Sequence, residues 1–146
     1  NILLWKPSDI SEIEGVTSKG GSWIIVIKTA TNVLKGDNFV FVYPELLQNK
    51  IIVSRGEVIS SEIIVKNDLN YKNINSKIKT LLRKTRDKIK SRGSIVNEIT
   101  TRGDFIKKIR DSIKINQKIK YQLEIVSLKD SKTAEQIIVD LNITEL

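Results

Sequence analysis

The sequence predicts an α+β fold: a single domain with one curved mixed sheet of about five or six strands and two helices on one side. Apolar segments rich in β-branched residues occur in both the first and the last third of the chain. Between them, residues 72–92 and 103–115 repeat isoleucine and leucine at helical spacing. Strands that flank a pair of amphipathic helices are typical of a sheet whose helices gather on one face.

The first 22 residues predict little regular structure. Ser8 and Asp9 are suitable helix caps, so we expect one or two helical turns that begin near Ser8 and end at Gly15. The stretch SKGGS, residues 18–22, is interpreted as a flexible entry to the first strand.

Two strands with apolar residues on both faces follow. The segment WIIVIKTA, from residue 23, is typical of a central strand covered on both sides. A turn around Gly36 and Asp37 leads to a strand over residues 38–43, which Pro44 is expected to stop. Four aromatic residues of the chain are assigned to the core, namely Trp23, Phe39, Phe41 and Phe105.

The middle of the chain supplies a turn and the two helices. Arg55-Gly56 is interpreted as a turn between two strands, the second over residues 57–65. Gly93 is expected to terminate the helix over 72–92. Thr101, with Asp104 three residues later, predicts a capping box for the helix over 103–115. Two further strands are expected over residues 119–128 and 135–143.

Positive charge is concentrated in the helical segment. Residues 72–120 contain 16 Lys or Arg and 4 Asp or Glu, whereas the formal charge of the whole chain is +8. One interpretation is a solvated helix face in a lysine-rich composition, and the other is a surface for nucleic acid or anionic lipid. The candidates for anion contact are Lys79, Arg83, Arg86, Lys90, Arg92 and Arg110.

The residue inventory favours binding over catalysis. Histidine and cysteine are absent, which removes the commonest general base and the thiolate nucleophile. A metal-dependent nuclease of ribonuclease-H-like fold is a weaker alternative, because its first strand requires an acid that WIIVIKTA lacks. The acids of the strand regions are interpreted as turn or exposed-strand residues: Asp37, Glu57, Glu62 and Asp140. We therefore predict no catalytic residue, no metal, no cofactor and no small-molecule substrate.

The apolar runs are too short for a membrane-spanning helix, so we expect this domain to be soluble. The chain opens on Asn1 and contains no methionine, which indicates a piece of a longer polypeptide.

The order of motifs resembles the C-terminal region of an uncharacterised cyanobacterial family, often labelled myosin-like. The resemblance spans about residues 8–126, through Asn32-Val33-Leu34 with Gly36 and Asp37, then Gly56-Glu57, Leu81-Leu82 and Arg92-Gly93. Family helices are alanine-rich where this chain has lysine and threonine.

The resemblance implies a setting and no activity. Members join a pair of membrane segments to a coiled coil and then to a domain of this kind. It implies a non-catalytic scaffold or docking domain, associated with a membrane through a segment outside this chain. Its partner would be another protein or a second copy of itself, with nucleic acid or anionic lipid as the alternative.

Overall fold

The computed structural model describes residues 2–65, 70–115 and 119–146. The predicted α+β class is confirmed, with three helices and nine strands in the described residues. The chain divides into two compact units, unit 1 over Asn1–Lys50 and unit 2 over Ile51–Leu146. The prediction of one curved sheet of five or six strands is wrong, because the strands form three separate sheets of three, two and four strands.

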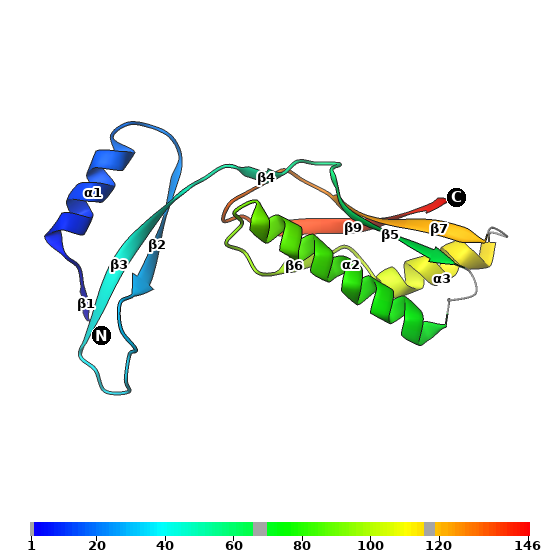
Figure 1. Cartoon of the computed structure of the whole chain (residues 1–146), viewed down its shortest axis with the longest axis horizontal. Coiled ribbons are helices and arrows are strands. Elements are labelled where there is room, and N and C mark those ends of the chain that lie inside the picture. The colour runs from blue at the N-terminus through cyan, green and yellow to red at the C-terminus, as the bar shows by residue number, and fades with distance from the viewer. Residues whose placement is uncertain (1, 66–69, 116–118) are drawn as a thin grey trace. The chain divides into compact units, whose positions relative to one another are not determined.

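Unit 1 is a three-stranded sheet with one helix. Its elements are β1 (Ile2–Leu4), α1 (Pro7–Thr17), β2 (Trp23–Thr29) and β3 (Phe39–Gln48). The strand order is β1-β3-β2, with β1 parallel and β2 antiparallel to β3. The segment predicted to be a central strand, β2, is therefore an edge strand, and α1 lies beside the sheet (Figure 1).

Helix α1 continues past the predicted stop at Gly15. A glycine ends a helix when it adopts the left-handed conformation, and Gly15 is not among the glycines with positive φ. Gly20 is, at φ 85°, and its N–H donates to the Thr17 carbonyl oxygen at 3.1 Å. At the other end Pro7 occupies the first helical turn, where its missing N–H is not needed.

Strand β3 also runs past its predicted end at Pro44. In the β2–β3 ladder, Ala30 N–H donates to the Phe41 carbonyl oxygen at 2.8 Å, so every second pair from there is hydrogen-bonded. Pro44, opposite Ile27, belongs to a pair that is not hydrogen-bonded, so the ladder to β2 needs no N–H from it. On the other side of β3, β1 pairs only with Phe39–Phe41. Proline is tolerated here because neither neighbour needs its N–H.

Unit 2 contains the larger sheet, in the order β5-β7-β9-β6. Strand β7 is antiparallel to β5 and β9, while β6 is parallel to β9, so the sheet is mixed as predicted. A small antiparallel ladder joins β4 to β8. The elements are β4 (Ile51–Val53), β5 (Val58–Val65), α2 (Tyr71–Ser91), β6 (Ile99–Thr101), α3 (Phe105–Ile115), β7 (Lys120–Ser127), β8 (Ser131–Lys132) and β9 (Ile137–Glu145).

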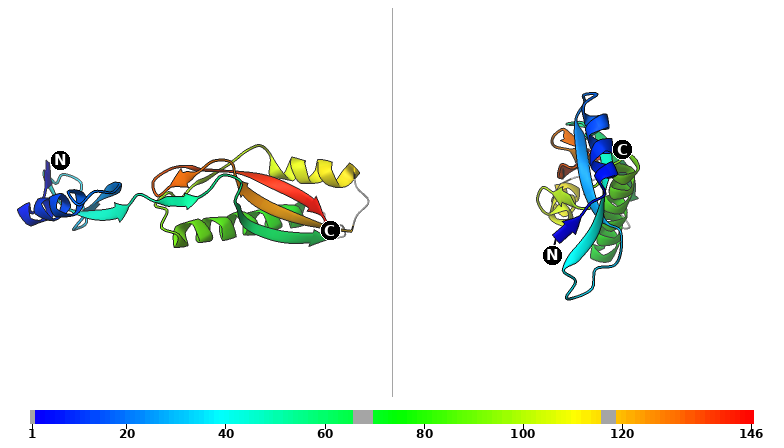
Figure 2. Two further views of the ribbon diagram at one scale, coloured as in Figure 1. Left: turned by 90° about the horizontal axis from the view of Figure 1, so that it is seen from above. Right: turned by 90° about the vertical axis from the view of Figure 1, so that its left-hand side faces the viewer.

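Both long helices pack on one face of this sheet, as predicted (Figure 1, Figure 2). Alternate residues of β7 and β9 are buried, which is the pattern of strands with one covered face. They meet the apolar stripes of α2 and α3 in one cluster, which includes Ile59, Leu81, Ile109, Leu123 and Val139, each fully buried. The predicted isoleucine stripes thus form the core of unit 2.

The turn at Gly56, the helix end at Gly93 and the capping box at Thr101 were all predicted in what is now unit 2. Gly56, at φ 80°, lies in the predicted turn, but the strands on either side pair with other strands. Gly93, at φ 99°, ends α2 as predicted. The predicted capping box is wrong, because Thr101 lies in β6 and Asp104 itself caps α3 by accepting from Ile106 and Lys107 N–H at 2.9 and 3.1 Å.

Candidate functional site

One face of the unit 1 sheet carries exposed aromatic side chains of β3. Phe39, Phe41 and Tyr43 of β3 are 55%, 58% and 45% exposed. The assignment of Phe39 and Phe41 to the core was therefore wrong, while Phe105 is buried and Trp23 is half-buried. We call this surface the aromatic face and define it by Ile2, Leu4, Ile24, Val26, Phe39, Phe41, Tyr43 and Leu47.

Strand register determines which side chains share this face. Paired residues of neighbouring strands point to the same side, and successive residues alternate. Phe39 and Phe41 pair with Ile2 and Leu4 of β1, and Leu47 pairs with Ile24 of β2. The opposite face of β3 holds Val40 and Val42, which are only 6% and 5% exposed.

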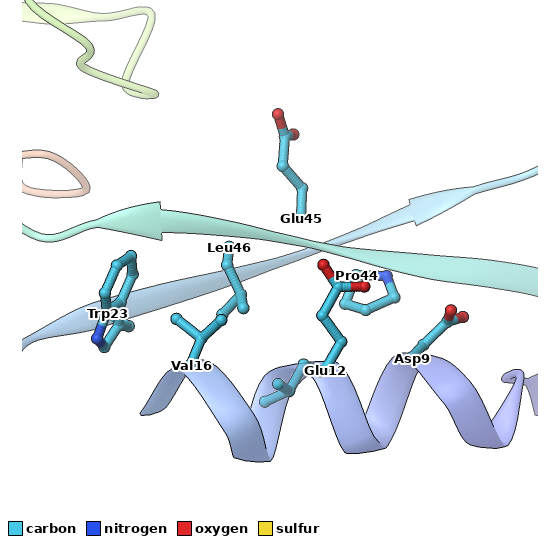
Figure 3. Close-up of a pocket in the computed structure, with 8 residues that line it drawn as sticks. Asp9, Glu12, Val16, Trp23, Pro44, Glu45 and Leu46 are labelled. Atoms are coloured by element: carbon cyan, nitrogen blue, oxygen red, sulfur yellow. The ribbon is translucent and has the colours of Figure 1, made fainter. Parts of the chain in front are cut away.

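Helix α1 lies on the face of the sheet opposite the aromatic face. Figure 3 shows Leu46 pointing toward α1 and Glu45 pointing away from it. Between α1 and the sheet is an open cavity of about 460 Å³, lined by Asp9, Glu12, Ile13, Val16, Trp23, Pro44, Glu45 and Leu46.

One ion pair lies within the aromatic face. Lys28 of β2 pairs with Glu45 of β3, two residues whose register positions lie on the same side of the sheet as Phe41. The hydrogen bond to Glu45 raises the pKa of Lys28. Both side chains are more than 40% exposed, so the pair stays hydrated and contributes little to folding.

A second surface runs along α2. Five cations follow one another at intervals of seven, four, three and four residues. On an α-helix this spacing places them within about 60° around the helix axis and along about 27 Å of its length. We call them the basic stripe: Lys72, Lys79, Arg83, Arg86 and Lys90. All five are exposed, and they lie on the side of α2 opposite the buried Ile74 and Leu81.

Four of the six predicted anion contacts belong to this stripe, and two do not. Arg92, at the end of α2, turns into the fold: Nη1 donates to the Ile52 carbonyl oxygen at 3.0 Å, and Nη2 lies 2.6 Å from Glu57 Oε1. Arg110 is exposed on α3, a different element. The structure thus brings Lys79, Arg83, Arg86 and Lys90 together and separates Arg92 and Arg110 from them.

Three cations at the sheet side of α2 pair with two carboxylates. Glu62 of β5 lies 2.6 Å from Lys84 Nζ and 3.4 Å from Lys77 Nζ. The hydrogen bond from Lys84 lowers the pKa of Glu62, and the hydrogen bond from Arg92 lowers that of Glu57, in both cases against the raising effect of burial. Within the basic stripe, the closest ion pair among the described residues is a long 3.4 Å contact between Arg83 and Asp87, and both side chains are more than 60% exposed.

Sequence reasoning left one end of the stripe out of the candidate set. Lys72 lies seven residues before Lys79, a spacing of almost two full turns, and this was the available signal. Between these two lysines the surface forms a shallow hollow, which Asn75, Ser76 and Thr80 also line. The hollow adds amide and hydroxyl groups to the basic stripe.

The acids that a nuclease would need are dispersed. Asp37 accepts from Leu34 N–H in a turn at 2.8 Å, and Asp140 lies 2.9 Å from Lys108 Nζ. Burial raises the pKa of Asp140, but the hydrogen bond from Lys108 and a backbone N–H outweigh it and the pKa is lowered. Across residues 2–65, 70–115 and 119–146, no three acidic side chains are grouped as a metal ion would require.

No helix within the described part of the chain is both long and apolar enough to cross a membrane. Comparison with known proteins gave no match, whether to a family model, to a curated protein or to a solved structure.

Proposed function

We propose that this chain is a docking module that acts by binding another protein, and that the aromatic face is the surface it uses. The observation that carries the proposal is the exposure of Phe39, Phe41 and Tyr43 in one row of β3. Exposed apolar side chains that gather on one face of a folded chain often mark an interaction site. Aromatic side chains are also enriched where proteins bind one another.

The dimensions of the face favour an amphipathic helix as its occupant. Strands lie about 4.8 Å apart, so the outer strands β1 and β2 are separated by about 10 Å across β3. An α-helix with its side chains is about 10–12 Å across, which matches this width. A standard interface buries about 800 Å² on each partner, more than so narrow a face offers to a second copy of the sheet.

The setting proposed for the module follows from the resemblance over residues 8–126. We propose a scaffold in which a coiled coil precedes the module and membrane attachment lies outside this chain. The helix-binding role is independent of that setting, because it rests on the register and exposure of unit 1 alone.

Selection from a displayed library of amphipathic peptides about four helical turns long tests the proposal, with the whole chain as bait. We expect enriched peptides to carry apolar residues at i, i+3, i+4 and i+7 and to bind at least tenfold more weakly to the Phe41→Thr variant. Leu34→Thr is the matched control, because Leu34 is 69% exposed in the β2–β3 connection and should bind as the wild type does.

Two results would overturn the helix-binding proposal. One is that enriched peptides bind the Phe41→Thr chain as tightly as the wild type. The other is that sedimentation shows a dimer which Phe41→Thr disrupts, since the occupant would then be a second copy of the chain.

A further inference from the structure

Among the residues that the structure describes, little negative charge lies near the basic stripe. Helix α2 contains one acidic residue, Asp87, among nine basic residues if Arg92 at its end is included. The carboxylates of β5 and of the preceding turn pair with the cations on the sheet side, Lys77, Lys84 and Arg92. The carboxylates that pair with α2 are therefore concentrated where it meets the sheet, and among the described residues its outer line is the more positive side of the helix.

The length of the stripe indicates a polymeric anion. A single phosphate would meet only one or two of the five cations, and exposed ion pairs are individually weak. A nucleic-acid duplex carries one charge per about 1.7 Å of axis, so about 27 Å of helix can meet several phosphates at once. Five cations in one line can contact several charges of a polyanion at once.

The chemistry around the stripe favours nucleic acid over a lipid surface. A helix that binds in a membrane interface inserts an apolar face, whereas the apolar face of α2 is buried against the sheet. The residues beside the lysines are Asn75, Ser76 and Thr80, and such hydroxyl and amide groups commonly bond phosphate and sugar oxygens.

The form of nucleic acid follows from what the helix lacks. Single strands are held largely by stacking of bases on aromatic side chains. Helix α2 has one aromatic residue, Tyr71 at its first position, and residues 72–91 have none, so the basic stripe offers charge and hydrogen bonds but no series of stacking platforms. We propose that the basic stripe binds the phosphate backbone of a nucleic-acid duplex without reading its sequence.

The test measures binding of fluorescent duplex DNA and duplex RNA to the whole chain by anisotropy over a range of salt concentrations. The variant replaces Arg83, Arg86 and Lys90 with Glu. We expect at least tenfold weaker binding, and a slope of log affinity against log salt that is shallower by about 2 to 3, because each lost phosphate contact removes about 0.9.

The matched control makes the same change of charge away from the stripe, with Lys19, Lys35 and Lys129 replaced by Glu. It should bind nearly as tightly as the wild type. A second stripe variant with Gln at positions 83, 86 and 90 keeps the test valid if the Glu variant folds poorly, which far-UV circular dichroism reveals.

Three results would overturn the proposal: equal loss in the stripe and control variants, no salt-dependent duplex binding by the wild type, or stripe-dependent binding to phosphatidylserine vesicles without duplex binding. Phe41→Thr should leave duplex binding intact, so failure here and failure of the helix-docking proposal can be told apart.

Discussion

Lys90 and Arg92 stand two residues apart near the end of α2, yet their surroundings differ completely. Lys90 is exposed on the outer side of the helix. The Arg92 side chain is only 31% exposed, pairs with Glu57 and donates a hydrogen bond to the Ile52 carbonyl oxygen. Two residues correspond to about 200° of rotation on a helix, which carries Arg92 round to the buried side. A run of basic residues therefore divides into cations free to meet a ligand and cations that stabilise the fold.

The Arg92–Glu57 pair gives a pH-dependent prediction. Glu57→Gln should lower the free energy of unfolding at neutral pH by about 1 kcal/mol, because a hydrogen-bonded ion pair with limited exposure is lost. Since the pKa of Glu57 is lower in the folded chain than its ordinary value, the contribution is present above that ordinary value and is lost as pH falls through the lowered one.

The difference between wild type and Glu57→Gln should accordingly shrink on acidification. Denaturant unfolding followed by far-UV circular dichroism at neutral and at acidic pH measures it. Glu98→Gln, at an exposed position of unit 2, is the control. A difference that stays constant down to acidic pH would show that the pair does not stabilise the folded state through the Glu57 charge.

At the scale of elements, strand β3 shows why apolar residues on both faces need not mean a central, covered strand. Its even-numbered valines are buried beneath the α1 side, and its odd-numbered aromatics are exposed. Both faces are apolar in the sequence, but only one meets another element of unit 1. The exposed face is the feature on which the docking proposal rests.

Neighbouring residues of β3 provide a matched test of this arrangement. Val42→Thr should cost about 1–3 kcal/mol, because it places a hydroxyl in a buried site. Phe41→Thr should change stability by no more than about 0.5 kcal/mol, because the side chain is exposed and threonine suits a strand. Both tryptophans, Trp5 and Trp23, lie in unit 1, so their fluorescence reports its unfolding. A larger cost for Phe41→Thr than for Val42→Thr would refute the assignment of faces.

At the scale of the whole molecule, the described residues build their buried contacts in two places. The main core cluster contains only residues between Ile52 and Leu141, while Val40 and Val42 are buried outside it in unit 1. Each unit also has its own proposed surface, the aromatic face in unit 1 and the basic stripe in unit 2. The two proposals therefore assign one binding surface to each unit.

Hydrogen exchange on the whole chain checks the separation of the cores. Leu81→Ala should cost about 2–5 kcal/mol and lower protection in α2 and β7, because Leu81 is fully buried there. Val42→Thr should lower protection in β2 and β3 and leave the slowest amides of unit 2 unchanged. If each variant lowers protection equally in both units, the two cores form one cooperative structure.

The sequence by itself determined the order and type of the main elements, the limits of α2, and the placement of basic residues on its outer side. These features are local: helical periodicity, a glycine with positive φ at residue 93 and the spacing of Lys79, Arg83, Arg86 and Lys90 all act within a few turns. The end of α2 and the outer face of its basic residues follow from such short-range interactions, whereas α1 ran past its expected stop at Gly15.

Only the tertiary structure decided how the strands are divided among sheets and which apolar face is left exposed. Strand pairing joins residues far apart in the chain, such as Ile51 with Lys132, and period-two patterns do not specify the partner. A strand that is apolar on both faces can be covered on two sides or on one, so Phe39 and Phe41 could not be assigned from spacing. The orientation of Arg92 likewise depended on Glu57, 35 residues earlier, because an ion pair forms only after distant segments are brought together.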